Sequence, residues 1–167
     1  ELVHVNEHRG GPETAAHLLE FDSVHGRYEG DVRAEAAGLV VDGRPVTFSE
    51  HSSPAEIDWA GFGVEIVIES TGAFKTRRDL IAHLDRGASS VVVACPVKDA
   101  EVLNVVMGCN DQSYDPSTHA IVTAASCTTN CLAPIVKVLH ESIGIEQGAI
   151  TTIHDATNTQ AIVDSPH

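Results

Sequence analysis

Residues 126–131 (Ser-Cys-Thr-Thr-Asn-Cys) carry the most reactive group in the sequence, the thiol of Cys127. An apolar, strand-like run at 120–122 leads into this segment. A helix is predicted after it, from apolar residues at the three- and four-residue spacing of one helix face, namely Leu132, Ile135, Val136, Leu139 and Ile143. We therefore expect Cys127 at a helix N-terminus, where unpaired backbone N–H groups and the helix dipole stabilise a thiolate. A cysteine with a lowered pKa is a nucleophile.

A second segment supplies a partner for this thiol. Residues 150–153 (Ile-Thr-Thr-Ile) are β-branched and predict a strand that delivers His154. A strand-helix-strand unit brings its two ends to the same edge of a sheet. A thiolate beside an imidazole is a nucleophile with its base or its cationic partner.

The elements that must position these groups alternate along the chain. Buried-type strands are predicted at 64–69, 90–94 and 104–108, helices at 13–21 and 76–86, and two or three antiparallel strands within 32–48. This alternation predicts an α/β fold with a largely parallel sheet.

Composition excludes several classes of function. The 167 residues carry a net charge of −14, which argues against a nucleic-acid or anionic membrane surface. The sequence has no long apolar run and no secretory signal, so we expect a soluble chain that does not span a membrane. No metal site is expected, and we interpret His4 and His8, which flank Glu7, as surface or edge residues. The four cysteines lack metal or redox spacing, and Cys95, Cys109 and Cys131 are expected to be buried.

Four motifs in the same order resemble the phosphorylating glyceraldehyde-3-phosphate dehydrogenases. They are residues 22–27 (Asp-Ser-Val-His-Gly-Arg), 69–72 (Glu-Ser-Thr-Gly), 126–134 (Ser-Cys-Thr-Thr-Asn-Cys-Leu-Ala-Pro) and 151–160 (Thr-Thr-Ile-His-Asp-Ala-Thr-Asn-Thr-Gln). The resemblance covers essentially the whole chain. It implies a cytoplasmic, homotetrameric, NAD-dependent enzyme that converts glyceraldehyde 3-phosphate and inorganic phosphate into an acyl phosphate through a cysteine thioester.

The resemblance also assigns cofactor-binding positions. In a dinucleotide-binding fold, an acidic residue at the end of the second strand takes the adenosine ribose hydroxyls and repels a 2′-phosphate. Asn6 and Glu7 stand at that position, which favours NAD over NADP. The other cofactor positions that the resemblance implies are Ser70, Thr71, Gly72, Phe74 and Ala94.

For the substrate, the resemblance makes Cys127 the nucleophile that adds to the aldehyde and His154 the acid-base group. The hydroxyls of Ser126, Thr128, Thr157 and Thr159 match positions that line the phosphate sites. Ala124 and residues 155–156 (Asp-Ala) depart from the usual pattern, so the exact sugar phosphate stays open.

The domain organisation follows from the same comparison of motifs. We expect a Rossmann-type NAD-binding domain at 1–125 and the beginning of an α+β catalytic domain at 126–167. The Gly-x-Gly-x-x-Gly loop and the first strand-helix unit of the Rossmann fold are not found, and both ends look cut. We therefore expect these 167 residues alone to be inactive.

Alternative functions remain open from the sequence. A related erythrose-4-phosphate dehydrogenase shares the cysteine run, although both Thr157 and Thr159 favour the three-carbon substrate. Residues 154–160 also resemble an arsenic-resistance-associated branch in which arsenate replaces phosphate. A function of a different class is a thiol redox sensor or binding module, because a thiol of low pKa is easily oxidised.

Overall fold

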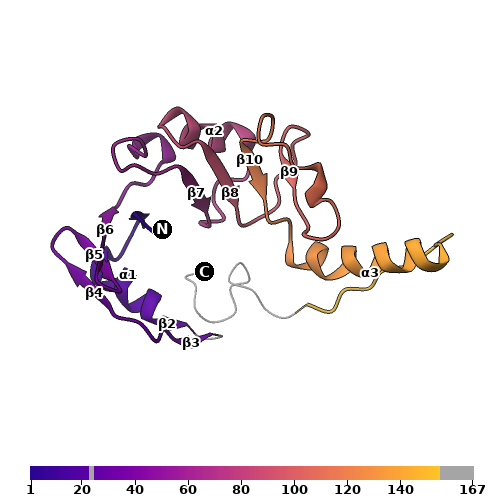
Figure 1. The fold of residues 1–167 in the computed structure, drawn as a ribbon, viewed down its shortest axis with the longest axis horizontal. Coiled ribbons are helices and arrows are strands. Elements are labelled where there is room, and N and C mark those ends of the chain that lie inside the picture. Colours follow the sequence, from indigo (N-terminus) through magenta and orange to yellow (C-terminus); the bar gives the residue numbers. More distant parts are fainter. Residues whose placement is uncertain (23–24, 155–167) are drawn as a thin grey trace, which may run out of the picture.

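The computed structural model describes residues 1–22 and 25–154, which form two four-stranded sheets (Figure 1). In the first sheet, β1 (His4–Asn6) pairs in parallel with β6 (Arg44–Ser49). The antiparallel strands β5 (Gly38–Val41) and β4 (Val32–Glu35) continue from β6, which confirms the predicted antiparallel insertion. Helix α1 (Gly11–Glu20) buries Ala16 against this sheet. The short hairpin of β2 (Phe21–Asp22) and β3 (Gly26–Arg27) follows α1.

The second sheet is entirely parallel. Its strand order is β7 (Ile66–Glu69), β8 (Ser90–Val93), β10 (Ile121–Thr123) and β9 (Leu103–Asn104). Helix α2 (Arg77–Asp85) begins at Thr76, whose hydroxyl accepts the N–H of Asp79. Short 3₁₀ turns lie at Pro54–Glu56 and Asp111–Ser113. The predicted α/β class with a parallel sheet is confirmed.

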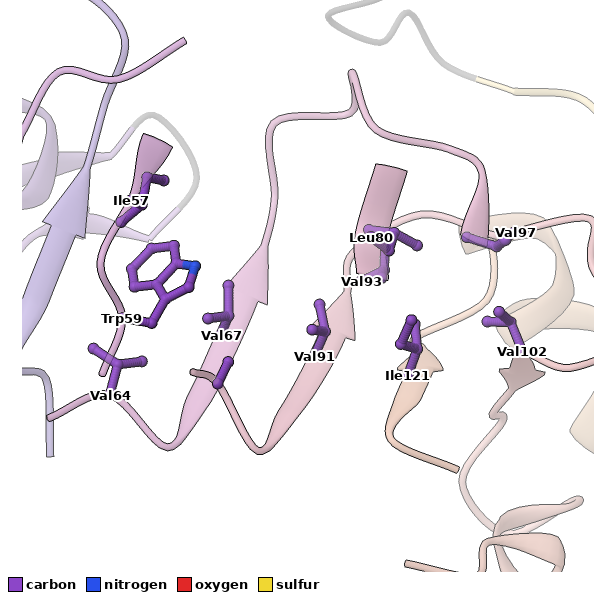
Figure 2. Packing of buried hydrophobic residues seen from close by; sticks show 11 residues of the cluster. Ile57, Trp59, Val64, Val67, Leu80, Val91, Val93, Val97, Val102 and Ile121 are labelled. Carbon is purple, nitrogen blue, oxygen red and sulfur yellow. The ribbon is translucent and has the colours of Figure 1, made fainter. Parts of the chain in front are cut away.

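One face of the parallel sheet carries the main hydrophobic core (Figure 2). Leu80 of α2, Val91 and Val93 are fully buried, and Trp59 closes the cluster beyond β7. β-Branched side chains suit a pleated, buried surface, which is why the apolar run at 90–93 forms a strand here. The opposite side of β7 is exposed at Ile66 and Ile68, so the strand predicted as a buried type is buried on one face only in the described residues.

Helix α3 (Cys127–Ile143) projects from the end of the parallel sheet (Figure 1). It runs over the residues that the apolar spacing predicted, and it ends at Gly144. No residue of α3 is buried by the described part of the chain. Ile143 is 81% exposed, so the apolar face of this helix is formed but not packed.

Two predicted strands differ from the structure. The strand expected at 104–108 ends at Asn104, because the Val106 N–H bonds to the Asn110 side chain and the chain then turns at Gly108. Residues 150–154 form no strand in the described part, since β-propensity produces a strand only where a neighbouring strand completes the ladder. The expected burial of the cysteines is also wrong, because Cys95 and Cys109 are half-buried and Cys131 is exposed.

A buried histidine joins the two sheets. His4 is only 7% exposed, so it is not the surface histidine that the sequence allowed, although its strand β1 lies at the edge of the sheet. Its Nδ1 lies 2.7 Å from Thr47 Oγ1, and its Nε2 lies 2.9 Å from Ser49 Oγ. The imidazole stacks on Phe62 at a centroid distance of 3.8 Å and meets Trp59 edge-on. The pKa of His4 is lowered to about 4, mainly by burial and to a smaller extent by the charge of His51.

This burial predicts a pH-dependent stability. The unfolded state binds a proton at His4 below about pH 6.5, whereas the folded state does so only near pH 4. Unfolding free energy should therefore fall by up to about 3 kcal/mol as the pH drops between these values. Urea titrations should show this slope reduced in His4→Gln and unchanged in His8→Gln, an exposed control. An identical slope in all three proteins would contradict the role given to His4.

Candidate active site at the start of helix α3

Ser126 starts helix α3 as its N-cap. Its Oγ accepts the Thr129 N–H at 3.0 Å and lies 2.7 Å from Thr129 Oγ1. Cys127 is consequently the first residue of the helix, where backbone N–H groups have no partner within the helix. This is the placement that the sequence predicted. No acidic residue lies in the first turn to oppose a thiolate there.

The chain enters α3 through a strained backbone conformation. Ala125 has φ of +56°, in the left-handed region that costs a non-glycine residue about 1 kcal/mol. Its N–H donates to Thr123 Oγ1 at 2.9 Å, and the Thr123 hydroxyl donates to Asn104 Oδ1 at 2.8 Å. Asn130 Nδ2 donates to the carbonyls of Ala124 and Ser126 at 2.7 and 2.9 Å. These bonds hold the turn that places Cys127.

The thiol and the imidazole meet at hydrogen-bond distance. Cys127 Sγ lies 3.0 Å from His154 Nε2, and the thiol is exposed. The hydrogen bond from His154 lowers the pKa of Cys127 against a smaller opposing effect of burial. The hydroxyl and N–H of Thr128 lower this pKa further. The arrangement is that of a nucleophile with an adjacent acid-base group.

Two of the candidate phosphate-binding hydroxyls lie next to the thiol in sequence. Ser126 Oγ lies 2.7 Å from Thr129 Oγ1, and the Thr128 hydroxyl helps to lower the pKa of Cys127. Both therefore lie beside the thiol, within the first helical turn. Thr157 and Thr159 lie outside the described residues.

The candidate cofactor residues lie at the carboxyl ends of strands in both sheets. Asn6 ends β1, and its Oδ1 accepts the His51 N–H at 2.9 Å and the Ser49 hydroxyl at 2.8 Å, so its amide is occupied. The side chain of Glu7 is exposed beside it. An exposed carboxylate at this position is available to ribose hydroxyls.

A second group of candidate cofactor residues follows β7 and β8. Ser70, Thr71 and Gly72 are exposed, and Gly72 has φ of +68°, which glycine adopts without strain. Phe74 is half-buried and packs on the core of the parallel sheet. Ala94 is exposed after β8, and its N–H bonds to the carbonyl of Glu69 at 2.9 Å.

Other features of the described residues bear on the chemistry. A cavity of about 630 Å³ opens beside α3 between Lys98, Asn104, Ala125 and Thr129, but the residues described as lining it include neither Cys127 nor His154. Within 1–22 and 25–154, no three His, Cys, Asp or Glu side chains form a group able to hold a metal ion. No helix of the described part is long and apolar enough to cross a membrane.

Sequence reasoning missed Thr123, Asn104 and Asn130 as residues that shape the site. A polar residue at the end of an apolar strand was the available signal for Thr123. The bond between Asn104 and Thr123 joins two strands that meet only in the fold, whereas Asn130 bonds locally to the carbonyls of Ala124 and Ser126.

The fold and the site together define a Rossmann-like α/β protein with a cysteine–histidine pair at a helix start. Comparison with known proteins identifies the family. Residues 1–77 match the family model of the glyceraldehyde 3-phosphate dehydrogenase NAD binding domain, and residues 126–167 match that of the C-terminal domain. The chain belongs to the glyceraldehyde-3-phosphate dehydrogenase family.

The individual relatives align with this chain over its whole length. Glyceraldehyde-3-phosphate dehydrogenase 3 of Nostoc sp. is 55% identical over 167 residues, and the enzymes of Geobacillus stearothermophilus and Streptomyces coelicolor are 46% and 44% identical over the same length. In each case the whole of this chain aligns with 49% of the relative. The chain therefore spans about half the length of these curated relatives.

The geometry at Cys127 predicts selective alkylation. Because the pKa of Cys127 is lowered, its reaction with iodoacetamide should reach half of its maximal rate at a lower pH than the ordinary thiol value of about 8.5. In the complete protein that contains this chain, mass spectrometry should find Cys127 labelled before Cys131, one turn away. His154→Asn should move the rate profile of Cys127 to higher pH. An unchanged profile in His154→Asn would contradict the claim that His154 lowers the pKa of Cys127.

Proposed function

We propose that the complete protein catalyses the NAD-dependent oxidative phosphorylation of glyceraldehyde 3-phosphate. The observation that carries this proposal is the 3.0 Å contact between Cys127 Sγ and His154 Nε2 at the start of α3. Family membership supports it, since the relatives are named glyceraldehyde-3-phosphate dehydrogenases. We further propose a cytoplasmic homotetramer, as the resemblance implies.

The residues near the thiol supply the first steps. The Cys127 thiolate adds to the aldehyde carbon and forms a thiohemiacetal, whose oxygen becomes the developing anion. His154 donates a proton to this oxygen, which makes the hydroxyl of the thiohemiacetal, and takes the proton back as the carbon is oxidised. The helix N-terminus and the hydroxyls of Ser126 and Thr128 provide donors for the substrate phosphate or for inorganic phosphate. Phosphate attack on the thioester releases the acyl phosphate and restores the Cys127 thiolate.

NAD supplies the acceptor for the hydride when it is bound. The residues present fit this cofactor, because an exposed Glu7 follows β1 and an exposed glycine-containing turn at 70–72 follows β7. Ligands of open α/β sheets bind at these carboxyl ends. We propose that Glu7 binds the adenosine ribose and that Asn6 holds the turn behind it.

Turnover of the complete protein tests this proposal. Absorbance at the reduced nicotinamide band should rise with glyceraldehyde 3-phosphate, phosphate and NAD, and Cys127→Ser should abolish the rise. His154→Asn should lower kcat by roughly a hundredfold to ten-thousandfold, the usual contribution of acid-base catalysis. Cys131→Ser, one turn along α3, is the matched control and should keep its activity. Reversible oxidation of Cys127 without any NAD reduction would instead identify a redox sensor.

The cofactor preference tests the role given to Glu7. A carboxylate at the end of β1 repels the 2′-phosphate of NADP, so the complete protein should prefer NAD. Glu7→Ala should reduce the ratio of kcat/KM for NAD to that for NADP, whereas Glu29→Ala, which removes an exposed carboxylate elsewhere, should leave it unchanged. A wild-type protein that prefers NADP would contradict this assignment.

A further inference from the structure

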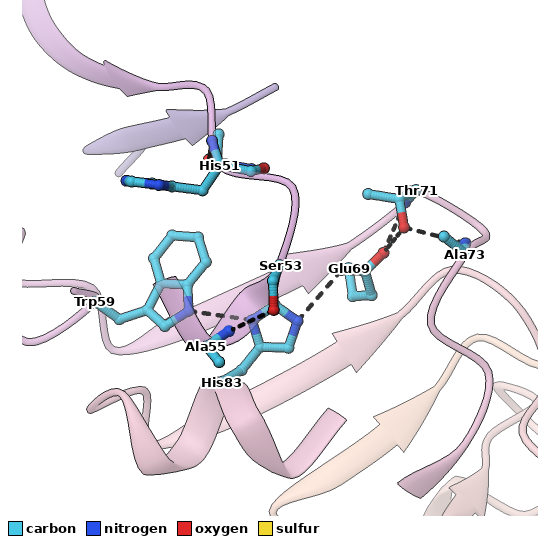
Figure 3. Close-up of polar contacts among 9 residues, drawn as sticks. His51, Ser53, Ala55, Trp59, Glu69, Thr71, Ala73 and His83 are labelled. Carbon is cyan, nitrogen blue, oxygen red and sulfur yellow. Dashed lines mark hydrogen bonds and ion pairs between the residues drawn. The ribbon is translucent and has the colours of Figure 1, made fainter. Parts of the chain in front are cut away.

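A buried carboxylate lies directly beneath the turn at 70–73. Glu69 ends β7 and is only 5% exposed. Its Oε1 accepts the Thr71 N–H at 2.8 Å and also accepts the Thr71 hydroxyl proton (Figure 3). The Thr71 Oγ1 in turn accepts the N–H of Ala73 at 3.1 Å. One carboxylate oxygen thus fixes both the backbone and the side chain of the turn.

Two further buried side chains stand behind this carboxylate. His83 of α2 places its Nε2 at 3.3 Å from Glu69 Oε2, in an electrostatic contact whose geometry is poorer than that of a full hydrogen bond (Figure 3). On the other side of the ring, Trp59 Nε1 lies 3.1 Å from His83 Nδ1. An indole nitrogen only donates, so Nδ1 must accept and the ring proton must sit on Nε2, facing Glu69.

Burial of the Glu69 carboxylate has a large desolvation cost, which only several donors can offset. Burial alone raises the pKa of Glu69, but the contacts from His83 and Thr71 reverse this effect and lower it. The lowered pKa favours the ionised carboxylate, which accepts from Thr71 through Oε1 and lies in electrostatic contact with His83 through Oε2. An uncharged side chain with a single acceptor oxygen cannot serve both sides.

The hydrogen bonds already made by the Thr71 hydroxyl determine whether it can donate to a ligand or accept from one. Its hydroxyl proton is committed to Glu69, and one oxygen lone pair is committed to Ala73. A second lone pair of the hydroxyl oxygen remains on this exposed residue. This position therefore accepts from a donor such as a ribose hydroxyl or an amino group, and it does not donate to a phosphate oxygen.

We propose that Glu69, held by His83 and Trp59, is a positioning residue for dinucleotide binding, and that it presents Thr71 to the ligand as a hydrogen-bond acceptor. This inference rests on the proposed binding of NAD at the turn 70–72. It assigns a role to three buried residues that make no contribution to the chemistry at Cys127.

Titration of the complete protein with NAD by calorimetry tests this role, with kcat at saturating NAD measured beside it. Glu69→Gln leaves a donor facing either His83 or Thr71, so it should raise the Kd for NAD about tenfold, since bonds to charged groups are the stronger ones. The value of kcat should change less than twofold, because Cys127 is held by separate contacts. Glu65→Gln, an exposed position just before β7, is the matched control and should leave Kd unchanged.

A double-mutant cycle separates positioning from general loss of stability. If Glu69 acts through Thr71, Glu69→Gln should add little to the Kd of Thr71→Val, and the two effects should be far from additive. Trp59→Phe keeps a ring in the core but removes the donor to His83, and it should raise Kd by a smaller factor. If Glu69→Gln fails to fold, the Kd of Trp59→Phe for NAD serves as the test of the positioning role.

This binding test and the turnover test of the proposed function can fail independently. A wild-type protein that binds NAD but shows no turnover would contradict the proposed reaction, and the effect of Glu69→Gln on the Kd for NAD could still be measured. An unchanged Kd in folded Glu69→Gln, or in Trp59→Phe where Glu69→Gln does not fold, overturns the inference. Full additivity with Thr71→Val, or a wild-type protein that does not bind NAD at all, also overturns it.

Discussion

Parallel strand pairing is the constraint on which the rest of the molecule depends. The register of the second sheet aligns Glu69, Val93, Thr123 and Asn104 in one row across its four strands. Because all four strands run the same way, the segments that leave this row emerge at a single edge. The turn at 70–73 and the entry to α3 are both such segments. The pairing therefore brings the candidate cofactor turn and the candidate nucleophile to one edge of the sheet.

The polar groups and the backbone turn at this edge cost free energy to form, and the packing of the apolar core beneath them offsets that cost. Glu69 is a buried carboxylate, Thr123 is a fully buried hydroxyl, and Ala125 adopts a left-handed conformation. Each of these is held by specific hydrogen bonds and by the packing of residues such as Val91 and Val93. Unfavourable local conformations persist where surrounding structure determines them, and they concentrate at functional sites.

The sequence predicted what local patterns control. The α/β class, the antiparallel insertion and the start of α3 at Cys127 all follow from the spacing and alternation of apolar residues. The sequence failed where burial depends on distant partners. His4 is buried because Phe62 and Trp59 pack against it, and residues 150–154 pair with no strand in the part of the chain that the structure describes. The proximity of Cys127 and His154 was expected from the topology of a strand-helix-strand unit, yet it is formed here without the second strand.

The unpacked state of α3 has a mechanical consequence. With 17 residues and a rise of about 1.5 Å each, the helix is roughly 25 Å long, and the bonds of Thr129 and Asn130 in its first turn fasten it to the segment that follows β10. Lys137, which donates to the Gly108 carbonyl at 2.7 Å, adds one tether near the middle. The helix is therefore held most firmly at its N-terminal end, which carries the Cys127 thiol. A tilt of the helix about this end would move Ile143, at the far end, much further than Cys127.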